Sequence, residues 1–210
     1  MKKGLSTSLK SALIAGSLLC SSAAFAEDQS SVYWKLNSGV SFLNKTDISH
    51  PLLGSSQLKT KTGFAINSSI GFRINPLVAV ELESGYARNE LDSIDGLGSV
   101  TGSASQVPIL ANLVLSPKFS ESVSGDLGLG LGVSINTADI GMARIGSLPS
   151  DTKTTFMGQI RAGLNFKLAE NISADLGYRL RLIDGPQFSS QISTNTVFGH
   201  VISAGVTVSF

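Results

Sequence analysis

Apolar residues alternate with polar or small ones in eight separate stretches of the sequence, and this alternation limits the possible folds more than any other feature. In the stretch 63–73, for example, Phe64, Ile66, Ile70 and Phe72 occupy even positions, and polar or small residues occupy the odd ones. Side chains two residues apart lie on the same face of a β-strand, and no stretch shows the 3.6-residue period of a helix. The sequence therefore predicts an all-β fold with strands at 32–42, 63–73, 78–88, 106–115, 123–135, 156–168, 172–182 and 197–210.

The connections between the predicted strands alternate in length. Residues 74–76 and 169–171 form tight links, and 116–122 is somewhat longer. The other four connections are longer and rich in Gly, Ser, Thr and Asp; they cover residues 44–62, 89–105, 136–155 and 183–196. Short periplasmic turns alternate with long extracellular loops in transmembrane β-barrels. The predicted strands are also long enough to cross the apolar layer of a bilayer, for which a tilted strand needs about 9–11 residues.

Aromatic residues distinguish a membrane barrel from a soluble β-sandwich. Ten of them, Tyr178 included, fall on the apolar face, and nine lie near strand ends; a sandwich core would hold them at mid-strand. Two belts of rings at headgroup level are typical of membrane barrels. One predicted belt comprises Trp34, Phe72, Phe166 and Phe210, and the other comprises Phe42, Phe64, Tyr86, Phe156 and Phe198. We therefore expect an eight-stranded antiparallel transmembrane β-barrel that contacts outer-membrane lipid and lipopolysaccharide.

The opposite face of the predicted strands carries charges of both signs. They are Lys35, Arg73, Glu81, Glu83, Asp126, Arg161, Asp175 and Arg179, with Lys167 and Arg181 on the same face. A soluble β-protein would present these groups to water, whereas in an eight-stranded barrel they enter an interior just wide enough for side chains. The mixture of signs predicts a neutralised polar network that plugs the interior. The alternative is a narrow porin.

The N-terminus has the organisation of a secretory signal peptide. Positive residues, among them Lys2 and Lys3, precede an apolar run at 11–19 that is too short to cross a bilayer as a helix. The small residues around Ala26 then predict cleavage between Ala26 and Glu27. We expect residues 1–26 to be a cleaved signal peptide and 27–210 to be the barrel domain of an exported outer-membrane protein; a retained membrane anchor is the alternative.

Composition excludes some classes of function for the predicted mature chain. Three of the 16 basic residues lie in the signal segment, which leaves 13 basic against 15 acidic residues. This near-neutral balance gives no support for nucleic-acid binding. The one cysteine, Cys20, also lies in the signal segment, so no disulfide is expected.

Several segments resemble one known family. Residues 156–181 (FMGQIRAGLNFKLAENISADLGYRLR) are similar to the penultimate hairpin of small outer-membrane barrels of the opacity-protein and outer-membrane-protein-A-like superfamily. Residues 81–86 and 107–112 resemble the third and fourth strands of these barrels, and the end of the chain resembles the signal read by the barrel-assembly machinery, carried here by Val206, Val208 and Phe210. The resemblance implies this fold and a membrane location. Family members serve as adhesins, immune-evasion antigens or structural proteins.

The sequence does not favour an enzyme. Some small barrels are hydrolases, but the only histidines are His50, in a predicted loop, and His200, whose neighbour Ser203 is expected on the opposite face of its strand. No paired-carboxylate or metal-ligand spacing is apparent, and Asp92 and Asp95 are accounted for by turn chemistry. We expect no catalytic residue, no cofactor and no metal.

Function is therefore expected in the predicted extracellular loops. Ile140, Met142 and Ile145 in the third loop and Phe188 in the fourth are apolar, and they predict either a patch that contacts a partner or packing of the loops on one another. The first hypothesis is an adhesin-like surface antigen that binds a host or matrix ligand. The second is a structural barrel without a dedicated ligand.

Overall fold

The computed structural model describes residues 31–44, 46–50, 54–94, 98–99, 101–142, 146–147, 151–184, 193–194 and 196–210. All regular elements in these ranges are β-strands. Among the described residues, no helix has the length and apolar character needed to cross a membrane. The predicted signal segment, with Ala26 and Glu27, lies outside the described residues.

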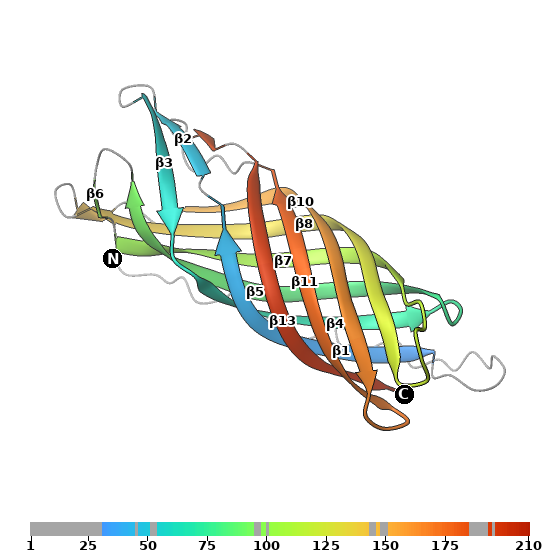
Figure 1. The fold of residues 1–210 in the computed structure, drawn as a ribbon. Helices are drawn as coiled ribbons and strands as arrows, with labels where there is room; N and C mark the ends of the chain where they lie inside the picture. The colour runs from blue at the N-terminus through green and yellow to red at the C-terminus, as the bar shows by residue number, and fades with distance from the viewer. Residues whose placement is uncertain are drawn as a thin grey trace, which may run out of the picture.

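Eight antiparallel strands form a closed barrel (Figure 1). Each strand pairs with its neighbour along the chain, and the last strand pairs with the first from Tyr33↔Ser209 to Leu43↔Gly199. The predicted fold class is thus confirmed. The barrel strands are β1 (Val32–Leu43), β4 (Gly63–Arg73), β5 (Val78–Ile94), β7 (Thr101–Leu115), β8 (Val123–Met142), β10 (Asp151–Lys167), β11 (Ile172–Ile183) and β13 (Val197–Ser209).

At the end of the barrel with short turns, all strands end where the sequence predicts. There every observed boundary lies within one residue of the predicted one, as for β4, which ends at Arg73, and β5, which begins at Val78. At the other end the prediction was wrong for four strands, because β5 continues to Ile94, β7 starts at Thr101, β8 continues to Met142 and β10 starts at Asp151. The apolar alternation stops before these ends, but backbone pairing continues between polar residues.

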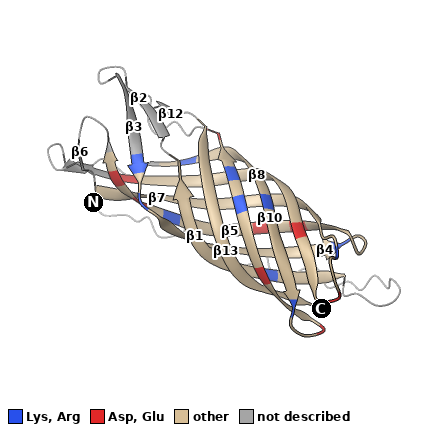
Figure 2. Cartoon of the chain, viewed as in Figure 1, with Lys and Arg blue, Asp and Glu red and all other residues tan. Residues whose placement is uncertain are grey.

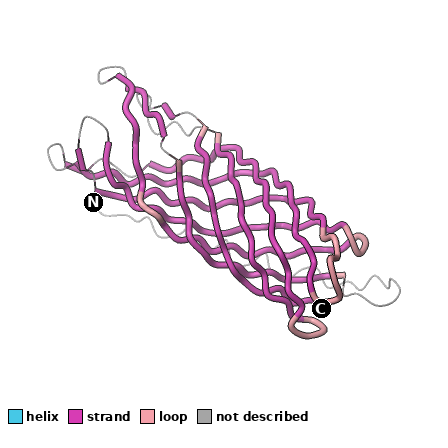
Figure 3. The backbone as a smooth tube through the Cα atoms, viewed as in Figure 1, coloured by secondary structure: helices cyan, strands magenta, loops and turns pink. Residues whose placement is uncertain are grey.

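Shorter strands extend the fold beyond this longer end of the barrel (Figures 1 and 3). Strands β2 (Thr46–His50) and β3 (Gly54–Thr60) form a hairpin, β3 pairs with β5, and β12 (Ser193–Thr194) pairs with β2. Strand β6 (Gly98–Ser99) pairs with β5, and β9 (Gly146–Ser147) pairs with β8. Parts of all four predicted long loops are therefore paired strand.

The barrel wall is apolar outside and polar inside, the reverse of a soluble β-protein. Ile70, Leu129 and Leu131 are more than 60% exposed, whereas the side chains of Glu83 and Arg181 are almost completely buried. In Figure 2 the charged residues recur within the barrel strands, between their ends. Since strand side chains alternate between two faces, the same period of two residues produces the lipid-type exterior and the ionic interior.

Candidate functional site

The barrel interior holds an equal number of buried positive and negative side chains. Among the described residues, four buried cations face four buried anions: Lys35, Arg161, Arg179 and Arg181, and Glu81, Glu83, Asp126 and Asp175. They come from five of the eight strands, always from the inward-facing register of the strand. We call these eight residues the ionic network.

Arg161 of β10 is the most extensively paired member of the ionic network. Its Nη2 donates to Glu81 Oε1 at 2.7 Å, and its Nε donates to Asp126 Oδ1 at 2.8 Å. Lys35 pairs with Asp126 as well. A buried charge is tolerated only when it is paired and hydrogen-bonded, and Arg161 satisfies two carboxylates at once.

Three ion pairs cross the whole width of the barrel, between two pairs of strands. Lys35 on β1 meets Asp126 on β8, and Arg179 Nε and Arg181 Nη2 on β11 lie 3.6 Å and 3.5 Å from Glu83 Oε1 on β5. In both cases the two strands are four places apart in the ring of eight, which is the greatest separation that the ring allows. The interior of the barrel is therefore spanned by side chains at two levels.

Uncharged polar residues complete the ionic network. Gln159 Nε2 donates to Glu83 Oε2 at 3.1 Å and its Oε1 accepts from Arg181 Nε at 3.1 Å, while Asn112 Nδ2 donates to Glu83 Oε2 at 3.3 Å. Arg179 Nη2 donates to Asn37 Oδ1 at 3.0 Å. Sequence reasoning had not included these amides, although their inward register was available as a signal.

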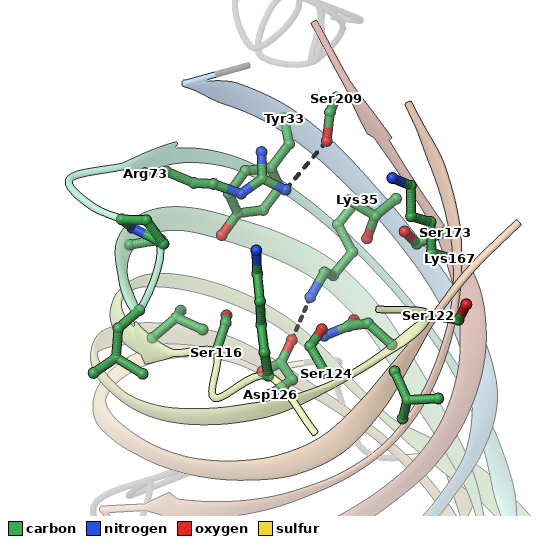
Figure 4. Close-up of a pocket in the computed structure, with 18 of the residues that line it drawn as sticks. Tyr33, Lys35, Arg73, Ser116, Ser122, Ser124, Asp126, Lys167, Ser173 and Ser209 are labelled. Carbon is green, nitrogen blue, oxygen red and sulfur yellow. Dashed lines mark hydrogen bonds and ion pairs between the residues drawn. The ribbon is translucent and has the colours of Figure 1, made fainter. Parts of the chain in front are cut away.

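A polar cavity of about 680 Å³ lies at the short-turn end of the barrel, and we call it the vestibule (Figure 4). Lys35 and Asp126 of the ionic network line it. On its wall, Arg73 lies over the ring of Tyr33, 4.5 Å from the centroid, and donates to Ser209 Oγ at 3.1 Å. Tyr33, which sequence reasoning also missed, donates its hydroxyl hydrogen to Glu81 Oε1 at 2.6 Å.

Two residues predicted on the charged face differ from the others in burial. Arg73 is half-buried and lines the vestibule, and Lys167 is exposed there. Both lie at the ends of their strands, β4 and β10, where the barrel opens. The period of two assigns the face of a residue but not its depth.

The residues predicted to form aromatic belts lie on the outer surface near the two ends of the wall. Trp34, Phe72, Phe166, Phe210, Phe42, Phe64, Phe156 and Phe198 are all between 37% and 71% exposed. Tyr86 is half-buried, because its ring packs at 5.7 Å from that of Phe64 and its hydroxyl pairs with Ser105 Oγ at 3.1 Å. Trp34 Nε1 donates to Ser68 Oγ at 2.8 Å.

The remaining predicted residues lie apart from the interior. Val206 and Val208 belong to β13 and pair with Leu36 and Trp34, and Phe210 follows the strand with its side chain 71% exposed. Ile140 and Met142 lie in β8 rather than in a loop, which corrects their predicted position. Ile145 and Phe188 lie outside the described residues.

Histidine and acidic side chains do not gather into a metal-binding group in the described part of the chain. His200 lies on the outer surface, where its Nδ1 is 2.6 Å from the hydroxyl of Tyr178. No group of three or more His, Cys, Asp or Glu side chains within the described residues could hold a metal ion.

A closed eight-stranded barrel with an apolar exterior, exposed aromatic residues near both ends of its wall and a buried ionic network defines a class, the outer-membrane β-barrel proteins. The particular family follows from the sequence: a model of the outer membrane protein beta-barrel domain matches residues 11–210, and the chain belongs to this family. It is an outer-membrane protein, and its short turns therefore face the periplasm and its longer connections the exterior. No curated protein sequence matches the chain.

Solved structures share the fold at low sequence identity. The chain is similar to Neisserial surface protein A, with a TM-score of 0.57, 22% identity, and 88% of this chain and 100% of that chain covered. It is also similar to OprG from Pseudomonas aeruginosa, with a TM-score of 0.55, 14% identity, and coverage of 87% and 98%. The outer membrane protease OmpT from Escherichia coli follows with 0.54, 9% identity, and coverage of 90% and 99%. At these identities the likeness concerns the fold alone.

Proposed function

We propose that this chain is a non-enzymatic surface-binding protein, in which a plugged barrel holds the extracellular connections in place for contact with a host-cell or matrix partner. The observation that carries the proposal is the continuation of barrel strands past the outer aromatic belt. Strand β10 begins five residues before Phe156, and β5 runs eight residues beyond Tyr86. These extensions, together with the β2–β3 hairpin, give the protein a hydrogen-bonded platform outside the membrane (Figure 1).

The interior supports binding rather than transport. Ion pairs link opposite strands, and the buried charges balance. A transport channel needs a polar pore that remains open, as in barrels of 16 or more strands. The alternative function is a structural barrel without a ligand, which the same interior would also serve.

Absence of catalysis is part of the proposal. His200 is engaged with Tyr178 on the outer surface of the wall, at the level of Phe42. The charged groups of the interior are committed to one another in the ionic network. Neither set resembles a nucleophile with an adjacent base.

The proposed contact residues are Ile140, Met142, Ile145 and Phe188, because apolar side chains in an extracellular region favour a partner-binding patch. The test replaces 143–150 with a short Gly-Ser turn in a chain that also carries Ile140→Ser and Met142→Ser, and it replaces 184–196 in a separate variant. The first replacement leaves β8 and β10 at their observed ends, Met142 and Asp151, so that the barrel ladder is retained.

Binding is measured with folded, detergent-solubilised protein on host-cell monolayers and on immobilised matrix proteins. We expect both replacements to reduce binding, whereas a matched replacement in the periplasmic connection 116–122 leaves it unchanged. Unchanged binding in both extracellular variants, with heat-modifiable gel migration intact, would leave the structural barrel as the function.

A further inference from the structure

On the extracellular side of the ionic network, each barrel strand contributes one inward residue whose side chain cannot form a hydrogen bond. In six strands this residue lies two positions toward the extracellular end from a polar inward residue, as Met157 does from Gln159 and Ile183 from Arg181. Together they form what we call the apolar ring: Gly39, Ala65, Ala87, Leu110, Gly132, Met157, Ile183 and Val201.

The larger members of the apolar ring pack against one another. Leu110, Met157 and Ile183 form one buried cluster, with Val197 partly buried against it, and the side chains of Leu110 and Met157 are 0% exposed. Ala65, Ala87 and Val201 form a second buried cluster. The apolar side chains therefore occupy the space inside the ring instead of surrounding an open passage.

The periplasmic side of the ring is polar and accessible to water. The vestibule reaches Lys35 and Asp126, and these two residues also line a smaller cavity of about 20 Å³ deeper in the barrel. That cavity is also lined by Asp175 and Arg179, whose Oδ1 and Nε have no hydrogen-bond partner among the described residues. A carboxylate oxygen and a guanidinium N–H without hydrogen-bond partners both attract water, and the cavity is large enough for one molecule.

The extracellular side of the ring is polar again. Ser41 Oγ donates to Asn89 Oδ1 at 3.0 Å, and Ser134 Oγ donates to Asn136 Oδ1 at 2.9 Å. Among the described side chains, a long hydrogen bond of 3.4 Å from Arg181 Nη1 to Gln106 Oε1 joins the two polar sides. The apolar ring is thus a thin layer between two layers that attract water.

From this layering we infer that the apolar ring, rather than the ionic network, is the barrier that stops water and ions from crossing the barrel. Charged groups hold water and exchange partners, whereas hydrophobic constrictions exclude water and block conduction by dewetting. Apolar cavities within proteins remain dry even when they are large enough for water. The inference rests on the proposed closed interior and assigns the closure to particular residues.

Matched substitutions separate wetting from simple obstruction. Leu110→Ala and Leu110→Ser remove nearly the same volume, but only serine supplies a hydrogen-bonding group; Val201→Ala and Val201→Ser form a second, smaller pair. Conductance is measured in planar bilayers in potassium chloride, with folding checked by heat-modifiable migration. We expect discrete conductance steps from the serine variants, and no steps from the alanine variants or from the unaltered protein.

Network variants provide the opposite control. Lys35→Met and Arg179→Met remove charges but keep the ring, and we expect them to remain closed. Conductance steps of equal size from the alanine and serine variants would show that the ring obstructs by volume alone. Conductance steps from the network variants, with none from the serine variants, would assign the barrier to the ion pairs. Either result overturns the inference. A stable open channel in the unaltered protein would instead refute the closed interior itself.

A crystal structure of the unaltered protein in detergent tests the inference without any substitution. We expect an ordered water in the small cavity, hydrogen-bonded to Asp175 Oδ1 or to Arg179 Nε, and none between the side chains of the apolar ring. A continuous file of water through the ring would contradict the inference even if every ring variant failed to fold.

Discussion

Lys35 and Asp126 meet across the full width of the barrel, although they are 91 residues apart in the sequence. Their strands, β1 and β8, lie at opposite points of the closed ring. The contact exists only once all eight strands are in register. It therefore ties the two halves of the barrel together in the final structure.

Removing one member of this pair is expected to destabilise the folded barrel strongly. Both side chains are at most 10% exposed, and an uncompensated buried charge costs about 3–5 kcal/mol. Lys35→Met and Asp126→Asn should each lower the free energy of unfolding by an amount in this range, measured by reversible urea unfolding in phospholipid vesicles. The double variant keeps the interior neutral, so its loss should be smaller than the sum of the single losses; an additive result would show that the two charges are not coupled.

An exposed ion pair supplies the control for this prediction. Lys61 Nζ and Glu90 Oε2 are 3.9 Å apart, and their side chains are 57% and 70% exposed. Solvent screens such a pair, and its contribution is about 0–1 kcal/mol. Lys61→Met should leave the urea midpoint nearly unchanged under the same conditions.

The packing of Tyr33 against Gly71 makes a second prediction about stability. These residues are register partners on β1 and β4, and a Cβ on Gly71 would lie 2.1 Å from Cζ of the tyrosine. Gly71→Ala must displace the ring and its hydrogen bond to Glu81, and overpacking of this kind costs about 1–3 kcal/mol. Gly177→Ala is the matched control, since its Cβ would meet nothing closer than 3.6 Å. Equal urea midpoints for the two variants would contradict the observed packing.

Much of the wall could be predicted from the sequence, because its determinants are local. Alternation assigns faces correctly, and turn residues such as Asn75 and Pro76 end the strands on the periplasmic side. The extracellular ends could not be predicted in this way. Beyond the aromatic belt the outer face meets water instead of lipid, so pairing such as Thr152↔Thr137 continues without an apolar outward face.

For the interior, the sequence predicts which kinds of side chain are present but not which of them are in contact. The charges on one face indicate a network, but which ones meet depends on the stagger between strands, and the sequence does not specify that stagger. Arg181 illustrates the difficulty, because its partners come from four other strands: Asn67, Glu83, Gln106 and Gln159. The apolar ring was overlooked for a related reason, since Leu110 looks like an irregularity in one strand and becomes part of a layer only when eight strands are aligned.

The outward face predicts how the protein responds to charge in the membrane. Leu129 is 62% exposed on β8 and lies between the two aromatic belts, opposite Ile160. Arginine at the bilayer midplane costs about 2–4 kcal/mol in a barrel, and about 0–1 kcal/mol near the interface. Leu129→Arg should therefore reduce the free energy of folding into vesicles far more than Leu168→Arg, which alters a 68% exposed residue in a periplasmic turn. Similar losses for the two variants would show that this face does not contact lipid.

A substitution at Phe210 is expected to affect assembly in cells and the stability of the folded protein to different degrees. Phe210 is the most exposed of the described large apolar residues at 71%, and its backbone N–H donates to Val32 O at 3.0 Å. Phe210→Ser keeps that backbone hydrogen bond and removes only a side chain that lies on the outer surface, so the urea midpoint of the refolded protein should change little. If the aromatic terminus is the signal read by the barrel-assembly machinery, the same variant should give much less heat-modifiable protein in the outer membrane of cells. A loss of stability in vesicles that matched the loss in cells would show that Phe210 acts through the folded structure, and an unchanged amount in cells would remove the assembly role.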